Sequence, residues 1–269
     1  MYQFKKLFIT ATLATTTALS GCVSTTTAGT ISPERKQLLI VSSGEILRLS
    51  SEYYRETLAE ARTKGTLDNN PAQVARLRKI ADRLIPQAAL LRPDAANWQW
   101  KVHTITDNTI NAYVMPGGKI VFYTGIIEKL NLTDDEIAAI MGHEMAHAIR
   151  EHSREKMSRK MATNGTLGIA GAALGLGGWQ AQVVGLAGEI GLNLPHSRTQ
   201  EAEADKIGLE LMARAGYNPD AAVTLWQKMD ASKETKMPQF LSTHPSSANR
   251  IKELQALAPQ VQHLYQQAK

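Results

Sequence analysis

Residues 143–147 read His143-Glu144-Met145-Ala146-His147, with two histidines four positions apart and a glutamate directly after the first. The stretch Thr133-Asp-Asp-Glu136 is a capping box, which predicts the start of a helix that carries both histidines. Positions i and i+4 differ by about 40° around a helix, so the two imidazoles leave the same face one turn apart. This spacing suits two ligands of one Zn²⁺, and it places Glu144 beside them as a candidate general base toward water.

A second acidic stretch, Glu201-Ala-Glu203-Ala-Asp205, lies on another expected helix. Glu201 can complete a His₂Glu set that leaves the fourth position for water. Asp205, one turn further on, shares the face of Glu201 and is a candidate acceptor for the free N–H of a ligand histidine. Glu203 is the alternative ligand, but it points about 200° away from Glu201, so only one of them can face the metal. His152 lies about 140° round the helix from His147 and is interpreted as a surface or packing residue.

Three short strands are expected upstream of the histidine helix. The stretch from Trp98 to Ile105 alternates with period two, and residues 110–115 and 119–123 flank a Pro116-Gly117-Gly118 turn. The predicted fold class is therefore α+β: a mainly helical domain with a small antiparallel sheet next to the histidine helix. A strand of this sheet could bind an extended peptide by strand addition.

The first residues have the composition of a secretory leader. Lys5 and Lys6 precede an uncharged apolar stretch that is too short to cross a bilayer, and the leader ends at the only cysteine, Cys22. The sequence Leu-Ser-Gly-Cys at its end resembles the bacterial lipobox. This resemblance implies that residues 1–21 are a lipoprotein signal peptide and that Cys22 is lipidated. Residues 22–31 are then expected to be a flexible tether.

The rest of the chain is divided into two parts. Ser32-Pro33-Glu34 predicts the start of a helix that runs to about Lys64, within an N-terminal helical region assigned to residues 32–95. Residues 96–269 are assigned to the metal-binding domain. Inside it, residues 165–194 are rich in Gly and Ala, and three interpretations stay open. The segment is a lid or interfacial segment over the site, a buried helical hairpin, or a membrane span.

The composition excludes several classes of protein. With 43% hydrophobic and 20% charged residues, the chain is ordinary for a globular protein, which argues against a disordered chain or a bundle of membrane spans. A single cysteine excludes an intramolecular disulfide and a cysteine-based zinc finger. The net charge of +5 is not gathered into a basic cluster with aromatic residues, so nucleic acid is not an expected partner.

Further motifs occur in the order found in a known family, the membrane-associated zinc metallopeptidases related to the CAAX prenyl protease, HtpX and BepA. Within this family the chain most resembles the mitochondrial Oma type and its bacterial lipoprotein relatives, over about residues 98–258. The resemblance rests on these motifs: Asn111-Ala-Tyr-Val-Met-Pro-Gly-Gly118, Thr124-Gly125, His143-Glu-Met-Ala-His147, Leu194-Pro-His-Ser-Arg198 leading to Glu201-x-Glu-Ala-Asp205, and Leu241-Ser-Thr-His-Pro-Ser-Ser-Ala-Asn-Arg250.

The resemblance implies a fold and a set of roles. The fold would be a zincin of the gluzincin type, with one Zn²⁺ per chain held by His143, His147 and Glu201. The strand that pairs with the substrate would contribute Asn111, Ala112, Tyr113 and Val114. His244 and Arg250 would line the site, where His244 could donate to the oxyanion or, as in some relatives, cap the zinc and shut the enzyme off. The alternative is that His244 merely caps the last helix and Arg250 forms a surface ion pair.

The expected function is that of a zinc-dependent metalloendopeptidase of the bacterial cell envelope. The protein would be anchored through Cys22, face the periplasm at the outer membrane, and hydrolyse peptide bonds of misfolded or misassembled envelope proteins. The alternative is a chaperone or scaffold lipoprotein for outer-membrane protein assembly with latent protease activity. The intact histidine motif and Glu201 favour the enzyme.

Overall fold

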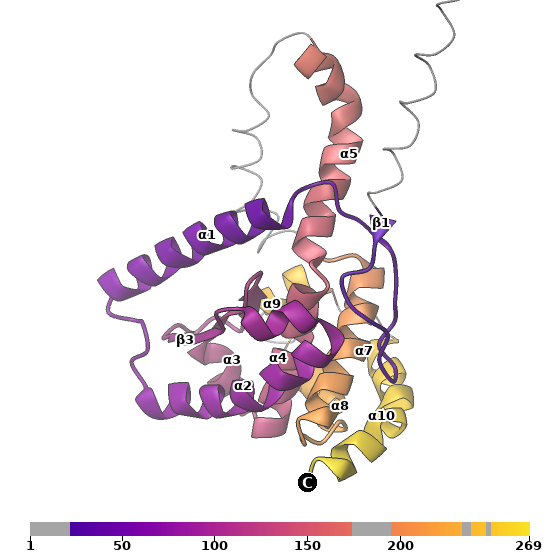
Figure 1. Cartoon of the computed structure of the whole chain (residues 1–269). Coiled ribbons are helices and arrows are strands. Elements are labelled where there is room, and N and C mark those ends of the chain that lie inside the picture. Colours follow the sequence, from indigo (N-terminus) through magenta and orange to yellow (C-terminus); the bar gives the residue numbers. More distant parts are fainter. Residues whose placement is uncertain (1–21, 174–194, 233–237, 246–248) are drawn as a thin grey trace, which may run out of the picture.

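Helices form most of the described chain and surround a small sheet (Figure 1), which confirms the α+β fold class. The computed structural model describes residues 22–173, 195–232, 238–245 and 249–269, so the predicted signal peptide over 1–21 lies outside the described residues. The strands are β1 (Cys22–Val23), β2 (Gln37–Leu38), β3 (Lys101–Ile105), β4 (Ala112–Met115) and β5 (Lys119–Tyr123). The helices are α1 (Ser43–Thr63), α2 (Pro71–Leu91), the 3-10 helix η1 (Pro93–Asn97), α3 (Thr124–Lys129), α4 (Asp134–Ile149), α5 (His152–Ala173), α7 (Arg198–Arg214), α8 (Ala221–Ser232), α9 (Gln239–Thr243) and α10 (Arg250–Gln267).

The strands β3, β4 and β5 form one sheet in the order β3-β5-β4. β4 and β5 are antiparallel and are joined by the expected turn, where Gly117 and Gly118 both have φ of 82°. β3 runs parallel to β5, so the prediction of an antiparallel sheet is wrong for this pair. The cause is the strand order: residues 106–111 carry the chain past the middle position to the far edge, and the hairpin then returns β5 beside β3. β4 is therefore an edge strand.

The histidine helix α4 begins where the capping box predicts it. The Thr133 hydroxyl accepts from the Glu136 N–H, and the Glu136 carboxylate accepts from the Thr133 N–H. α4 packs closely on α7 because glycines meet at the crossing: a Cβ on Gly208 would lie 2.7 Å from the backbone nitrogen of His143, and one on Gly142 would lie 2.9 Å from the Gly208 carbonyl. This close approach brings the acidic residues of α7 to the histidines of α4.

The chain turns sharply at the end of α4. The position expected for His152 rests on continuing this helix past His147, but α4 ends at Ile149 and a new helix, α5, begins at His152. Glu151 has φ of 49°, in the left-handed region that non-glycine residues seldom adopt. Its buried carboxylate accepts from Arg92 at 2.9 Å, which holds the turn in place. The break changes the direction of α5, so helical periodicity across it does not place His152.

The predicted helix start at Ser32 is also wrong. α1 begins at Ser43, and the Ser42 side chain is its N-cap, accepting from the Glu45 N–H. The Ser32 N–H and hydroxyl instead donate to the carboxylate of Glu210 on α7, so Ser32 is not available as a cap.

Residues 24–37, here called the N-terminal strap, lie against the helical domain. The backbone N–H groups of Thr30 and Ile31 donate to Glu210, and the Arg150 guanidinium donates to Thr26 at 3.0 Å. β1 and β2, at the two ends of this region, pair with one another. The segment expected to be a flexible tether is thus held to α4 and α7 by specific hydrogen bonds.

The Gly/Ala-rich segment is only partly described. Its first residues, 165–173, continue α5, which extends away from the body of the domain (Figure 1), and residues 174–194 lie outside the described residues. Among the helices of the described ranges, none is long and apolar enough to span a membrane.

Candidate metal centre

Four buried side chains bring their donor atoms together between α4, α7 and the residue that follows α9. His143 Nε2 lies 3.1 Å from His147 Nε2 and 3.6 Å from Glu201 Oε2. His147 Nε2 lies 3.3 Å from Glu201 Oε1. His244 is the fourth member, with Nδ1 3.3 Å from His143 Nε2 and 3.1 Å from Glu201 Oε1. The three ligands expected from the sequence therefore meet at one point.

The outer hydrogen bonds of the two α4 histidines decide which ring nitrogens carry protons. His143 Nδ1 lies 3.0 Å from Asp205 Oδ1 and 3.3 Å from Arg250 Nη2; because the carboxylate can only accept and Arg250 already donates to it, we assign the proton to Nδ1. His147 Nδ1 lies 2.8 Å from Nδ1 of His152, whose Nε2 lies 3.0 Å from Glu203 Oε2. Since His152 donates to this carboxylate, it accepts from His147 Nδ1. Both Nε2 atoms therefore present lone pairs to one another.

Converging lone pairs at this distance repel unless a cation lies between them. In a tetrahedral zinc site with bonds of about 2.0–2.1 Å, the ligand atoms lie roughly 3.3 Å apart. The separations among His143, His147 and Glu201 are 3.1, 3.3 and 3.6 Å. The donor set therefore fits a bound metal ion, and two imidazoles with one carboxylate are ligands that zinc accepts.

Glu144 lies between the two histidines on α4 and is buried. Burial raises the pKa of its carboxyl group, and the nearby His244 and His143 only partly oppose this shift. Glu144 Oε1 lies 3.2 Å from His244 Nε2 but makes no hydrogen bond within the described ranges. A buried carboxylate oxygen without such a bond is costly, which marks this position as one that awaits a polar ligand.

A narrow cleft of about 30 Å³ separates β4 from these histidines. It is lined by Asn111, Ala112, Tyr113, Val114, Glu144, His147, Ser153, His196, Thr243 and His244. The strand residues expected to bind substrate all lie along it, because β4 is an edge strand with one side of its backbone turned to the cleft. The volume accommodates about two water molecules, so a peptide can enter only if the cleft widens.

Arg250 lies behind Glu201 rather than in the cleft. Its Nη1 donates to Glu201 Oε2 at 2.7 Å and its Nη2 to Asp205 Oδ1 at 2.5 Å, while the guanidinium carbon lies 3.5 Å from the centre of the Trp226 ring. Carboxylates therefore occupy both ends of its guanidinium. Arg250 does not form a surface ion pair, because it is 3% exposed. It holds two acidic side chains in place toward His143.

Two further histidines belong to this region, and helical periodicity did not indicate them. His152 is fully buried beside His147, because the turn at Glu151 redirects α5. His196 lines the cleft, and its ring centre lies 3.8 Å from that of His147. Its position in the motif Leu194–Arg198 is the only signal in the sequence that points to it.

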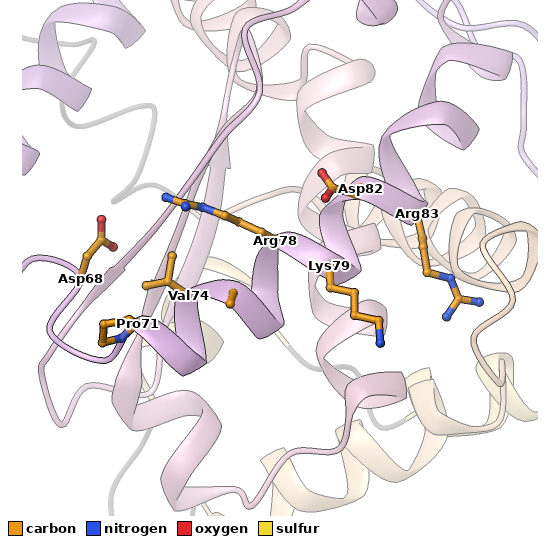
Figure 2. Close-up of a pocket in the computed structure, with 8 residues that line it drawn as sticks. Asp68, Pro71, Val74, Arg78, Lys79, Asp82 and Arg83 are labelled. Carbon is orange, nitrogen blue, oxygen red and sulfur yellow. The ribbon is translucent and has the colours of Figure 1, made fainter.

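A separate open hollow of about 640 Å³ runs along α2 (Figure 2). It is lined by Asp68, Pro71, Val74, Ala75, Arg78, Lys79, Asp82 and Arg83, and the labelled charged side chains of α2 point in different directions. None of the expected site residues borders it. Its size alone therefore does not make it the chemical centre of the molecule, since its charges do not converge on a point.

The known proteins that this chain resembles are metallopeptidases, in agreement with the metal-binding residues described above. The family model described as peptidase family M48 matches residues 71–258. The mitochondrial metalloendopeptidase OMA1 of Schizosaccharomyces pombe is 35% identical over 80% of this chain and 61% of its own length. From Escherichia coli, the metalloprotease LoiP is 29% identical over 90% of this chain and 92% of its own length. The β-barrel assembly-enhancing protease of the same organism is 22% identical over 85% of this chain and 47% of its own length.

The chain spans less than two thirds of the mitochondrial relatives, with 61% of the S. pombe protein and 45% of the human one. The match nevertheless contains the histidine helix, the acidic helix and β4. The family resemblance seen in the sequence motifs is confirmed, and the chain belongs to peptidase family M48.

Proposed function

We propose that this chain is a zinc-dependent metalloendopeptidase of the bacterial cell envelope. One observation carries the proposal: the lone pairs of His143, His147 and Glu201 converge beside the buried, unbonded Oε1 of Glu144, at the edge of β4. A metal-binding set, a candidate base and an edge strand are the three parts that peptide hydrolysis requires.

In this proposal His143, His147 and Glu201 hold one zinc ion. When bound, zinc polarises a water molecule and the carbonyl of the substrate. Asp205 orients His143 through Nδ1, and Arg250 orients Glu201 through Oε2. These outer contacts keep the ligand atoms close together before any ion arrives.

Glu144 is the proposed proton carrier. Its carboxylate takes a proton from the attacking water and later gives it to the leaving amine. The raised pKa suits this role, because a base that must also act as an acid works best with a pKa near the working pH.

His244 is the proposed donor to the oxygen of the scissile carbonyl. Burial lowers the pKa of His244, but the charges of Glu144 and Glu201 outweigh this and raise it above its usual value. Its Nδ1 lies 3.1 Å from Glu201 Oε1, and its Nε2 reaches the cleft beside Glu144. This preorganised N–H is of the kind that stabilises a developing negative charge.

The substrate would be an extended peptide paired with β4. Asn111, Ala112, Tyr113 and Val114 line the cleft, so a peptide added at this edge passes Glu144 and His147. Segments that are already unfolded fit such an edge, whereas folded proteins keep their backbone hydrogen bonds inside. This favours misfolded or misassembled proteins as substrates.

Two further features support a place in the envelope. The leader and Cys22 resemble those of a lipoprotein, which would put the enzyme on the periplasmic side, at the outer membrane. The name of one E. coli relative refers to β-barrel assembly, a process of that membrane. The proposed substrates are therefore envelope proteins that fail to assemble.

The test is digestion of casein and of an unfolded porin by the full chain purified in detergent, with zinc content measured on the same sample. The expected result is one zinc per chain and cleavage, and cleavage lost in Glu144→Gln while zinc stays bound. Cleavage that persists in Glu144→Gln contradicts the mechanism. Porin binding and assembly that persist in this variant without cleavage favour the scaffold function instead.

A further inference from the structure

His152 lies directly behind the metal-binding set, on the side of His147 that faces away from the cleft. It is 0% exposed, and its Nδ1 lies 2.8 Å from His147 Nδ1. Its Nε2 lies 3.0 Å from Glu203 Oε2. A neutral imidazole has one nitrogen that donates and one that accepts, so these two contacts of His152 must run in one direction.

The two possible directions of this hydrogen-bond chain have opposite consequences. If His152 donates to Glu203, it accepts from His147 Nδ1, and His147 Nε2 is a free lone pair for a metal. If the chain is reversed, His147 Nε2 carries a proton and cannot bind a metal, and the lone pair of His152 Nε2 faces a carboxylate. The charge of Glu203 therefore selects the direction that prepares His147 as a ligand.

Glu203 keeps its charge because cations surround it. His152 Nε2 and the Arg35 guanidinium both face its carboxylate and stabilise the charged form. Arg35 reaches both oxygens of Glu203, with Nη2 3.0 Å from Oε2, and Arg150 Nη2 lies 3.4 Å from the same oxygen.

Arg35 belongs to the N-terminal strap, not to the domain core. It also forms a bidentate pair with Glu155 of α5, at 2.7 and 2.8 Å. Paired arginine–carboxylate contacts of this kind fix orientation as well as charge. The strap thus reaches the metal-binding set in three hydrogen-bonded steps, through Glu203 and His152 to His147.

We propose that His152 and Glu203 are positioning residues that fix the orientation and proton of the ligand His147, and that the N-terminal strap completes this arrangement through Arg35. The inference rests on the proposed zinc site. It gives the region between the lipidation candidate Cys22 and α1 a role in the metal centre, in addition to any role as a connection to the membrane.

The test is the zinc dissociation constant, measured on the full chain by competition with a chromophoric chelator. Loss of an outer-shell partner typically weakens metal binding by about 10–100-fold. We expect this loss for His152→Ala and for Glu203→Gln. In Glu203→Gln the side-chain amide can donate to His152, which permits the reversed direction of the hydrogen bonds. Arg35→Ala should weaken binding less, because Arg150 still faces Glu203. His152→Gln should recover part of the affinity, because its side chain amide again offers one acceptor and one donor.

Glu210→Gln is the matched control. Glu210 is on the same helix as Glu203, is 0% exposed and binds the same strap, but its contacts lead to Ser32 and Arg214 rather than to a metal ligand. We expect its zinc affinity to stay within about twofold of wild type, whatever its thermal stability. The d–d spectrum of the Co²⁺-loaded protein, which reports ligand geometry, should change in His152→Ala and not in Glu210→Gln.

The outcomes separate this inference from the proposed function. Stoichiometric zinc in the wild type with unchanged affinity in both His152→Ala and Glu203→Gln overturns the positioning role alone. An equal loss of affinity in Glu210→Gln also overturns it, because the effect would then be general destabilisation. A wild type that binds no zinc overturns the proposed function and this inference with it. If His152→Ala does not fold, Glu203→Gln decides, since it is nearly isosteric.

Discussion

Glu201 and Glu203 are two residues apart on α7, and their surroundings differ. Glu201 faces acceptor atoms: the Nε2 atoms of His143 and His147 lie 3.6 and 3.3 Å from its oxygens. Glu203 faces donors, with Arg35, Arg150 and His152 around it. Around Glu201 two imidazole lone pairs converge although Arg250 and His244 also contact its oxygens, whereas around Glu203 the contacts are with donors.

The difference shows why only one of these two acidic clusters should bind a metal. On the side of Glu203, both carboxylate oxygens already accept from Arg35, so a metal would have to displace an arginine. On the side of Glu201, Arg250 neutralises the outer oxygen only, and the imidazole lone pairs still converge. Each of the two faces of α7 carries a buried glutamate. The residues that other helices and the strap bring to each glutamate decide its function.

The largest effect outside the ligands themselves is expected at Arg250. In Arg250→Ala the buried Glu201 and Asp205 lose their shared cation, so both turn or take up protons, and zinc affinity should fall by about 10–100-fold. Competition with a chelator measures this, and Arg35→Ala is the comparison on the other face of α7. Equal zinc affinity in Arg250→Ala and wild type would show that Arg250 does not support the metal-binding residues.

A second, smaller effect concerns acid stability on the face of Glu203. The pKa of Glu203 is lowered from 4.5 to about 2 in the folded protein, so the stability it contributes is present above pH 4.5 and is lost as the pH falls toward 2. Metal-free wild type and metal-free Glu203→Gln should therefore differ in free energy of unfolding near neutral pH and converge at about pH 2. Urea titrations across this range measure the difference, and a constant gap down to pH 2 would contradict the assignment.

The smallest effect is expected at the start of α7. The Ser197 hydroxyl accepts from the Gln200 N–H, about one turn before Glu201. Ser197→Ala should lower the free energy of unfolding by about 1 kcal/mol, which is typical for loss of an N-cap. Thr133→Ala, at the equivalent position of α4, is the control and should cost a similar amount. A loss of zinc affinity that exceeds this loss of stability, in either variant, would mean that fraying of the helix disturbs the metal-binding residues.

Helical periodicity in the sequence correctly predicts which side chains share a face within α4 and within α7. Four-residue spacing places His143 with His147, and the angle between Glu201 and Glu203 separates them to opposite sides, as the structure has them. These positions follow from helix geometry and from N-cap motifs that can be recognised in the sequence.

Contacts between different helices, strands and the strap depend on how these elements pack together, and sequence periodicity does not predict them. The turn at Glu151 that brings His152 behind His147 needs a left-handed residue that nothing in the sequence marks, because glutamate rarely adopts it. The strap is similar: Ser32 has the pattern of a helix cap but binds Glu210 instead. The parallel pairing of β3 with β5 follows from strand order, which short strands do not reveal.

We propose that Glu201, and not Glu203, completes a three-residue zinc site with His143 and His147. The most direct measurement is zinc content per chain in wild type, Glu201→Gln and Glu203→Gln after saturation with zinc and removal of unbound metal by gel filtration. The account predicts one zinc in wild type and in Glu203→Gln, and almost none in Glu201→Gln. Full zinc in Glu201→Gln together with loss in Glu203→Gln would contradict it.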